Sequence, residues 1–314
     1  GLKEKLENND GEQSGLKTFE SRFYSFITKD LKEIALKSGE RELERALLQL
    51  KNYIKSAAED QEFKEEKLKR LNEDRNLIEK KLDNSSSGLL HERLKQEIEE
   101  LVYYIKQRVF YRFSDFFKES FNPSTLAGDG RKIKDALELA MKELLKDIGF
   151  DFAQEFRATT LRVETFIKNL LAEEFDRLKE DIRKISPELF VGEFPFSEAE
   201  GPSFETAFGH LTPGDFRQEL ALFKSPKFFF EQNGRQVMAD KLYSALQQPA
   251  DEYVEEQKGK LITSYEQILE NEYNKMLRHI KLEVKEYVDG MDAALKNETL
   301  LDQLMEVEKR LIGA

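Results

Sequence analysis

The sequence holds few side chains of the kinds that carry out catalysis. It has no cysteine, and its three histidines are His91, His210 and His279. Glu92 follows His91, but no second histidine comes four residues later, so the HExxH zinc motif is absent. His279 and Glu283 would share one face of a helix, and no third ligand is evident. That spacing is typical of a solvated helical pair, and we predict no metal site.

Acidic side chains are abundant but do not indicate an acid–base catalyst. The chain has 62 Asp and Glu against 50 Lys and Arg, a formal net charge of −12. In so acidic a chain, paired carboxylates are expected on exposed surfaces. The glycine-rich stretch at 128–132 lacks the spacing of a phosphate-binding loop and a preceding strand. We therefore predict no catalytic residue and no cofactor in this chain. The negative charge also argues against a nucleic-acid partner.

One segment combines aromatic and basic side chains. Three consecutive phenylalanines cannot all face one side of a helix, because successive side chains rotate by about 100°. Some should remain exposed, and contiguous exposed apolar surface marks an interface with protein or membrane. The two lysines would suit lipid headgroups. We predict a membrane-contact site made of Phe223, Lys224, Lys227, Phe228, Phe229 and Phe230.

The same phenylalanines have a second interpretation. They can fill the core of their own segment, because other phenylalanines surround them in the sequence. These neighbours are Phe194, Phe196, Phe204, Phe208 and Phe216. The sequence pattern alone leaves lipid contact and core packing both open.

The composition indicates that long helices carry these side chains. Charged residues make up 36% of the chain and hydrophobic residues 39%, with only 16 Gly and 7 Pro in 314 residues. Strong helix formers dominate, and helix breakers are scarce. We predict an all-α fold, an elongated bundle of long antiparallel helices with an irregular, aromatic-rich insert at its tip. The sequence contains no apolar stretch long enough to cross a bilayer.

The pattern also predicts where the helices break. Residues 84–88 read as a turn that closes a helical hairpin, and 39–83 reads as one uninterrupted helix with a heptad seam. Five of the seven prolines fall within 187–234, so long helices cannot continue there. We expect helices over 39–83, 89–121, 131–184, 235–289 and 299–311. The candidate hinges are Ser38, Gly39, Gly149 and Pro249.

This order of elements resembles that of the bacterial dynamin-like protein family. In that family a GTPase domain leads into a helical neck and trunk, and the trunk tip carries a membrane-contacting paddle. Gly1–Lys5 and Ser14–Glu20 are similar to the passage from the GTPase domain into the first neck helix, and Gly39–Leu47 resembles the long helix that follows. Phe228–Glu231 and the helix through Asp251–Tyr253 resemble the paddle and its exit.

The resemblance implies a division of the chain and a cellular role. Residues 1–83 would form the neck and first long helices, 84–186 trunk helices, 187–234 the paddle-like tip insert, and 235–314 the return helices. The GTPase domain, with its GTP and Mg, has no matching positions in this chain. The chain would be a stalk that mediates membrane binding and self-assembly for tethering, remodelling or fusion. Its expected place is the cytoplasm, peripheral at the inner face of the cell membrane.

The resemblance also implies partners, and two other functions stay open. The implied partners are membrane lipid, further copies of the chain, and its own GTPase domain or a second dynamin unit. A helical pore-forming toxin is one alternative, although it would need a longer apolar hairpin. A soluble coiled-coil scaffold without a membrane role is the other, and in it every phenylalanine would be core.

Overall fold

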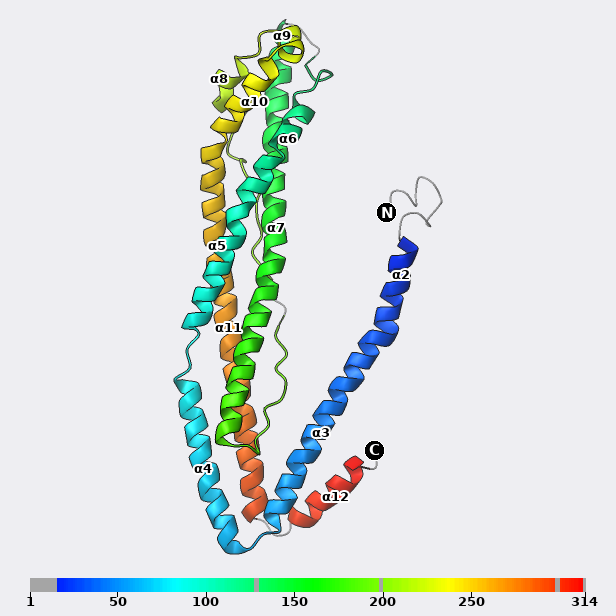
Figure 1. The fold of residues 1–314 in the computed structure, drawn as a ribbon, viewed down its shortest axis with the longest axis vertical. Coiled ribbons are helices and arrows are strands. Elements are labelled where there is room, and N and C mark those ends of the chain that lie inside the picture. The colour runs from blue at the N-terminus through cyan, green and yellow to red at the C-terminus, as the bar shows by residue number, and fades with distance from the viewer. Residues whose placement is uncertain (1–15, 127–129, 198–199, 297–299, 313–314) are drawn as a thin grey trace. The chain divides into compact units, whose positions relative to one another are not determined.

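Helices make up nearly all of the regular structure. The computed structural model describes residues 16–126, 130–197, 200–296 and 300–312, and no strand occurs among them. The prediction of an all-α helical bundle is confirmed. The elements, drawn in Figure 1, are α2 Leu16–Ser25, the π-helical turn η1 Phe26–Asp30, α3 Leu31–Ala57, α4 Gln61–Asp83, α5 Gly88–Tyr111, α6 Phe113–Ser120, α7 Gly130–Ile185, the 3-10 helix η2 Pro213–Phe216, α8 Arg217–Leu220, α9 Pro226–Glu231, α10 Gly234–Ala245, α11 Gln247–Lys296 and α12 Leu300–Ile312.

The predicted helix over 39–83 is wrong in one respect, because the structure divides it. α3 ends at Ala57, and α4 begins at Gln61. Asp60 has an extended backbone and accepts a hydrogen bond at Oδ1 from the Phe63 backbone N–H, 2.9 Å away. This side-chain cap satisfies a free N–H of the first turn of α4 and starts a new helix. The chain turns back at this point (Figure 1).

The chain divides into two units by its internal contacts. Unit 1 comprises Gly1–Asn84, Arg177–Phe194 and Arg278–Ala314, and unit 2 comprises Ser85–Asp176 and Pro195–Leu277. α7 and α11 each contribute a segment to both units. The segments predicted at 84–186, 187–234 and 235–314 are therefore each divided between the units, whereas 1–83 lies wholly in unit 1.

Unit 1 is held together by aromatic packing and ion pairs between its helices. The rings of Tyr53 on α3 and Tyr287 on α11 lie 6.1 Å apart, and the Tyr53 hydroxyl donates to the Tyr287 carbonyl oxygen. Lys81 on α4 pairs with Asp181 on α7 at 3.1 Å. α12 packs against α3. Much of α2 and the beginning of α3 stays exposed, apolar side chains included.

Unit 2 is built on α5 and the segments of α7 and α11 that belong to it. Arg112 of α5's C-terminal end binds Asp151 and Glu155 of α7 at 2.7 and 2.8 Å. Tyr265 of α11 donates to Glu164 of α7 at 3.0 Å. Between the three helices lies a core of fully buried aliphatic and aromatic side chains, including Leu94, Ile98, Ile105, Leu144, Phe152, Phe156, Leu261 and Leu269. These close-packed side chains make unit 2 a three-helix bundle.

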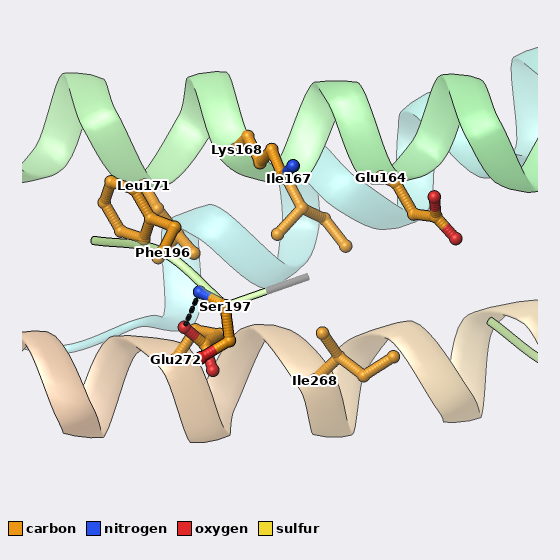
Figure 2. Close-up of a pocket in the computed structure, with 8 residues that line it drawn as sticks. All are labelled: Glu164, Ile167, Lys168, Leu171, Phe196, Ser197, Ile268 and Glu272. Atoms are coloured by element: carbon orange, nitrogen blue, oxygen red, sulfur yellow. Dashed lines mark hydrogen bonds between the residues drawn. The ribbon is translucent and has the colours of Figure 1, made fainter. Parts of the chain in front are cut away.

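An extended segment lies against α7 and α11 in unit 2. We call residues 195–197 and 200–211 the strap. Its Ser197 N–H donates to Glu272 of α11 at 3.1 Å, and Phe196 lies between α7 and α11 beside a pocket of about 240 Å³ (Figure 2). At its other end, the Ala207 N–H donates to the Gly149 carbonyl oxygen of α7 at 3.1 Å.

The strap fills the bundle with its phenylalanines. Phe204 stacks on Phe156 with ring centroids 5.2 Å apart, and Phe208 meets Phe152 edge to face at 5.8 Å. Both strap side chains are buried. The interpretation of these two phenylalanines as core is therefore confirmed, and much of the predicted tip insert is a strap along the bundle.

Candidate functional site

The short helix α9 positions the three consecutive phenylalanines. Ser225 has an extended backbone and caps the helix, since its hydroxyl oxygen accepts from the Phe228 N–H at 3.2 Å. Pro226 occupies the first helical position, where its missing N–H costs nothing and its fixed φ suits the helix. α6, α8, α9 and α10 gather at one end of unit 2 (Figure 1). The Ser-Pro pair therefore fixes where α9 begins.

Phe229 points into the core of unit 2. Its side chain is fully buried, and its ring lies 6.5 Å from the rings of both Phe117 and Phe121 and 5.2 Å from that of Phe223. The prediction that the three phenylalanines do not share one face is confirmed. In this structure Phe229 has no surface to offer to lipid, and its place in the predicted membrane-contact set is corrected to core.

Phe223, Phe228 and Phe230 are half-buried and reach the surface. Phe228 lies against Gly234, where an added Cβ would come within 2.8 Å of the phenylalanine ring. The Lys224 ammonium lies 5.1 Å from the centre of the same ring. That distance allows a cation–π contact. α9 thus keeps one phenylalanine inside and leaves its neighbours partly outside.

The structure adds a third cation, which the sequence analysis did not predict, to this surface. The Arg235 guanidinium of α10 lies 6.0 Å from the centre of the Phe230 ring. The signal that could have found it is its place directly after Gly234, at the start of the next helix. Lys224 and Lys227 are exposed, as is the acidic Glu231. We call the following residues the aromatic–basic surface: Phe223, Lys224, Lys227, Phe228, Phe230 and Arg235.

The turn that leads into this region carries an acidic side chain that closes the turn by hydrogen bonds. Thr212 and Asp215 form a capping box around η2, in which the Thr212 backbone N–H and hydroxyl both donate to Asp215 Oδ2, at 2.8 and 2.9 Å. These two hydrogen bonds lower the pKa of the Asp215 carboxyl. The carboxylate is thereby kept charged and bound to its own turn.

A groove in the same part of unit 2 separates α6 from α10. It has a volume of about 240 Å³ and is lined by aromatic side chains that include Phe113, Phe117 and Tyr243. Lys118 and Arg235 also line it, and the Arg235 Nη2 donates to the Lys118 carbonyl oxygen at 3.4 Å. The groove therefore combines aromatic rings with two cations and with the acidic Asp240.

The predicted hinges all lie within helices. Ser38 and Gly39 are inside α3, and Gly149 is inside α7. Pro249 falls in the first turn of α11, where proline is tolerated, and the chain breaks just before it at Leu246. α7 continues unbroken through Gly149, where it meets the strap. Whether any of these positions moves stays a prediction.

None of the described helices combines the length and apolar character needed to span a bilayer. Over the same residues, no group of three or more His, Asp or Glu side chains is placed to hold a metal ion. Since the described part of the chain is helical and without strands, it contains no GTPase domain of the α/β type.

Part of this chain is similar in sequence to a known protein. Dynamin-like protein A of Bacillus subtilis (strain 168) is 26% identical over 183 residues. The match covers 57% of this chain and 15% of that protein, so the chain corresponds to only a small part of its length. No family model matches the chain. No solved structure matches it either. The similarity supports a dynamin-like relationship at a coarse level.

Proposed function

We propose that this chain is the helical stalk of a bacterial dynamin-like GTPase and that its aromatic–basic surface contacts membrane lipid. The observation that carries the proposal is the arrangement at α9, where Phe228 and Phe230 are half-buried and each lies beside a cation. Apolar rings that each have a cation beside them suit the boundary between acyl chains and anionic headgroups. The partial similarity to a dynamin-like protein supports the same assignment.

The expected binding by one subunit is weak. Full burial of one large apolar side chain contributes about 1.5–3 kcal/mol, and these rings are already half covered, so each contributes less. Each basic residue near an anionic surface adds about 1 kcal/mol, and Glu231 opposes this. Stable attachment would therefore need several subunits that bind together, which is how self-assembly would supply avidity.

The rest of the proposed protein supplies the nucleotide chemistry. GTP and Mg would bind a GTPase domain outside this chain, and the stalk would transmit its motion to a membrane at the cytoplasmic face for tethering, remodelling or fusion. The exposed apolar side chains of α2 and the start of α3, such as Phe19, Phe23 and Ile34, offer a surface for that domain or for a second dynamin unit.

The main alternative is a scaffold without a membrane role. The burial of Phe229, Phe204 and Phe208 favours it, because these aromatic side chains serve the core. Under this alternative, the half-buried Phe228 and Phe230 would be the outer edge of the same core and would contact no lipid.

The decisive experiment is vesicle flotation of a Phe228→Ala, Phe230→Ala double variant. Vesicles of phosphatidylglycerol and phosphatidylcholine are mixed with the chain and floated on a density gradient, and unfolding is followed alongside. Membrane contact predicts that flotation falls at least severalfold while the fold persists. Replacement of Lys224 and Lys227 by Glu should weaken flotation most on the vesicles richest in phosphatidylglycerol.

Two control variants make the result interpretable. Tyr103→Ala with Tyr104→Ala removes two exposed aromatic side chains elsewhere in unit 2 and should leave flotation unchanged. Phe229→Ala should instead destabilise unit 2 by about 3–5 kcal/mol, because it empties a core position. A folded Phe228→Ala, Phe230→Ala variant that floats like the unmodified chain would contradict the proposal and favour the scaffold.

A further inference from the structure

An exposed row of side chains runs along α7 in unit 2. Leu139, Phe150 and Leu161 are 53%, 51% and 66% exposed. Eleven residues separate each from the next, close to three full helical turns, so the three share one face. The positions between them on that face are also exposed. The full row is Leu139, Glu143, Lys146, Phe150, Gln154, Arg157 and Leu161.

The spacing of the row is symmetric about Phe150. Its steps are four, three and four residues on either side. Leucine occupies both ends, and a charged residue stands seven residues from the centre on each side: Glu143 before it and Arg157 after it. A row with this symmetry is complementary to itself when a second copy lies antiparallel to it.

We propose that this row is the contact surface for a second copy of the chain, with the two α7 helices antiparallel and a two-fold axis passing beside Phe150. In that arrangement Phe150 meets Phe150 of the second copy, and Leu139 meets Leu161 of the second copy at both ends. The proposal deepens the self-assembly part of the proposed function, on which it rests, by naming the surface and the orientation.

Charge decides the orientation. Antiparallel packing places Glu143 against Arg157 of the second copy twice per dimer, and Lys146 against the neutral Gln154. Neither Glu143 nor Arg157 makes an ion pair within the described part of its own chain. Parallel packing would instead place each charged residue against its own copy, and like charges repel. The antiparallel dimer is therefore the favoured one.

The length of the contact is also set by charge. Beyond the leucines, the same register would place Lys132 against Lys168 of the second copy, and both lysines are exposed. This repulsion limits the contact to the row, which spans about 33 Å of helix. Three apolar side chains per copy over that length form a small interface, and we expect reversible association at micromolar or higher concentrations.

The absence of cysteine allows a direct test by disulfide trapping in the intact chain. Antiparallel packing predicts that Phe150→Cys forms a disulfide-linked dimer on mild oxidation. A mixture of Leu139→Cys and Leu161→Cys should also cross-link, whereas neither of these two variants should cross-link alone. In each variant alone the two thiols would lie about 33 Å apart, far beyond the reach of a disulfide.

A charge exchange supplies an independent readout without cysteine. Glu143→Arg and Arg157→Glu should each weaken dimerisation about tenfold in sedimentation equilibrium, because each places like charges together at both ends. A mixture of the two variants should restore dimerisation, since both contacts of the mixed dimer then join opposite charges. As a control, Lys142→Glu alters an exposed α7 residue outside the row and should change little.

The outcomes separate this proposal from membrane binding. All measurements are made without lipid, so a variant that fails to dimerise can still be tested for flotation. Cross-linking of Leu139→Cys alone, or a mixture of charge variants no better than either one, would overturn the antiparallel dimer. Normal flotation of a folded Phe228→Ala, Phe230→Ala variant, which would contradict membrane contact, would leave these dimerisation results unaffected.

Discussion

Replacement of Gly149 by alanine tests the packing of the strap on α7. In an exposed helix interior, Gly→Ala stabilises a protein by about 0.5–1 kcal/mol, because alanine loses less backbone freedom on folding. Gly149 is different, since a Cβ at this position would lie 2.1 Å from the Ala207 carbonyl oxygen. The added Cβ is fixed to the backbone of α7 and would collide with backbone atoms of the strap, so no side-chain rotation can relieve the collision. We therefore expect the sign of the effect to reverse.

The magnitude follows from two costs. The strap must move away by more than an ångström, which strains a packed core and costs about 1–3 kcal/mol. The same movement weakens the hydrogen bond from the Ala207 N–H to the Gly149 carbonyl oxygen, worth about 0.5–1.5 kcal/mol. Set against the gain in helix propensity, the variant Gly149→Ala should lose about 1–3 kcal/mol of unfolding free energy.

Gly259 on α11 is the matched control in the same unit. It is exposed, and an added Cβ meets nothing within 4 Å. Gly259→Ala should therefore stabilise unit 2 by about 0.5–1 kcal/mol. Both variants are compared with the unmodified chain by urea unfolding monitored by circular dichroism. If Gly149→Ala proves as stabilising as Gly259→Ala, the strap does not press on α7, and the reasoning fails.

Two further predictions concern unit 1. Gly39 lies inside α3, and an added Cβ would meet open space. Gly39→Ala should therefore stabilise the helix by about 0.5–1 kcal/mol and raise the thermal midpoint of α3 unfolding. A lower midpoint would indicate that this glycine is needed for another conformation. The pKa of Asp181 is lowered by hydrogen bonds from Lys81 and Lys184, so its contribution to stability is present above about pH 4 and is lost as the pH falls through its folded-state pKa. Asp181→Asn should flatten the acid limb of a stability–pH profile, and an unchanged limb would contradict this.

The long helices were predictable because their signals are local. The sequence predicts a helix over 131–184, and α7 spans Gly130–Ile185. Leu, Glu, Lys and Ala favour helix wherever they stand, and apolar spacing marks the buried face. The division of 39–83 was missed because its signal is one side chain, Asp60, which caps α4 through a single hydrogen bond. A heptad seam with a weak centre conceals such a break.

The aromatic site was only half determined by the sequence. Three consecutive phenylalanines must point in different directions, whatever the fold, because helical rotation is a local property. Which of them turns inward depends on Phe117 of α6 and on Phe121 just after it, more than a hundred residues earlier in the chain, whose rings pack near that of Phe229. Likewise, Arg235 joins Phe230 only because the turn at Gly234 brings α10 against α9. The residue types and their spacing determine which chemical groups this segment can offer. Which of these side chains reach the surface is decided only by the tertiary structure, because burial depends on packing partners that are distant in the sequence.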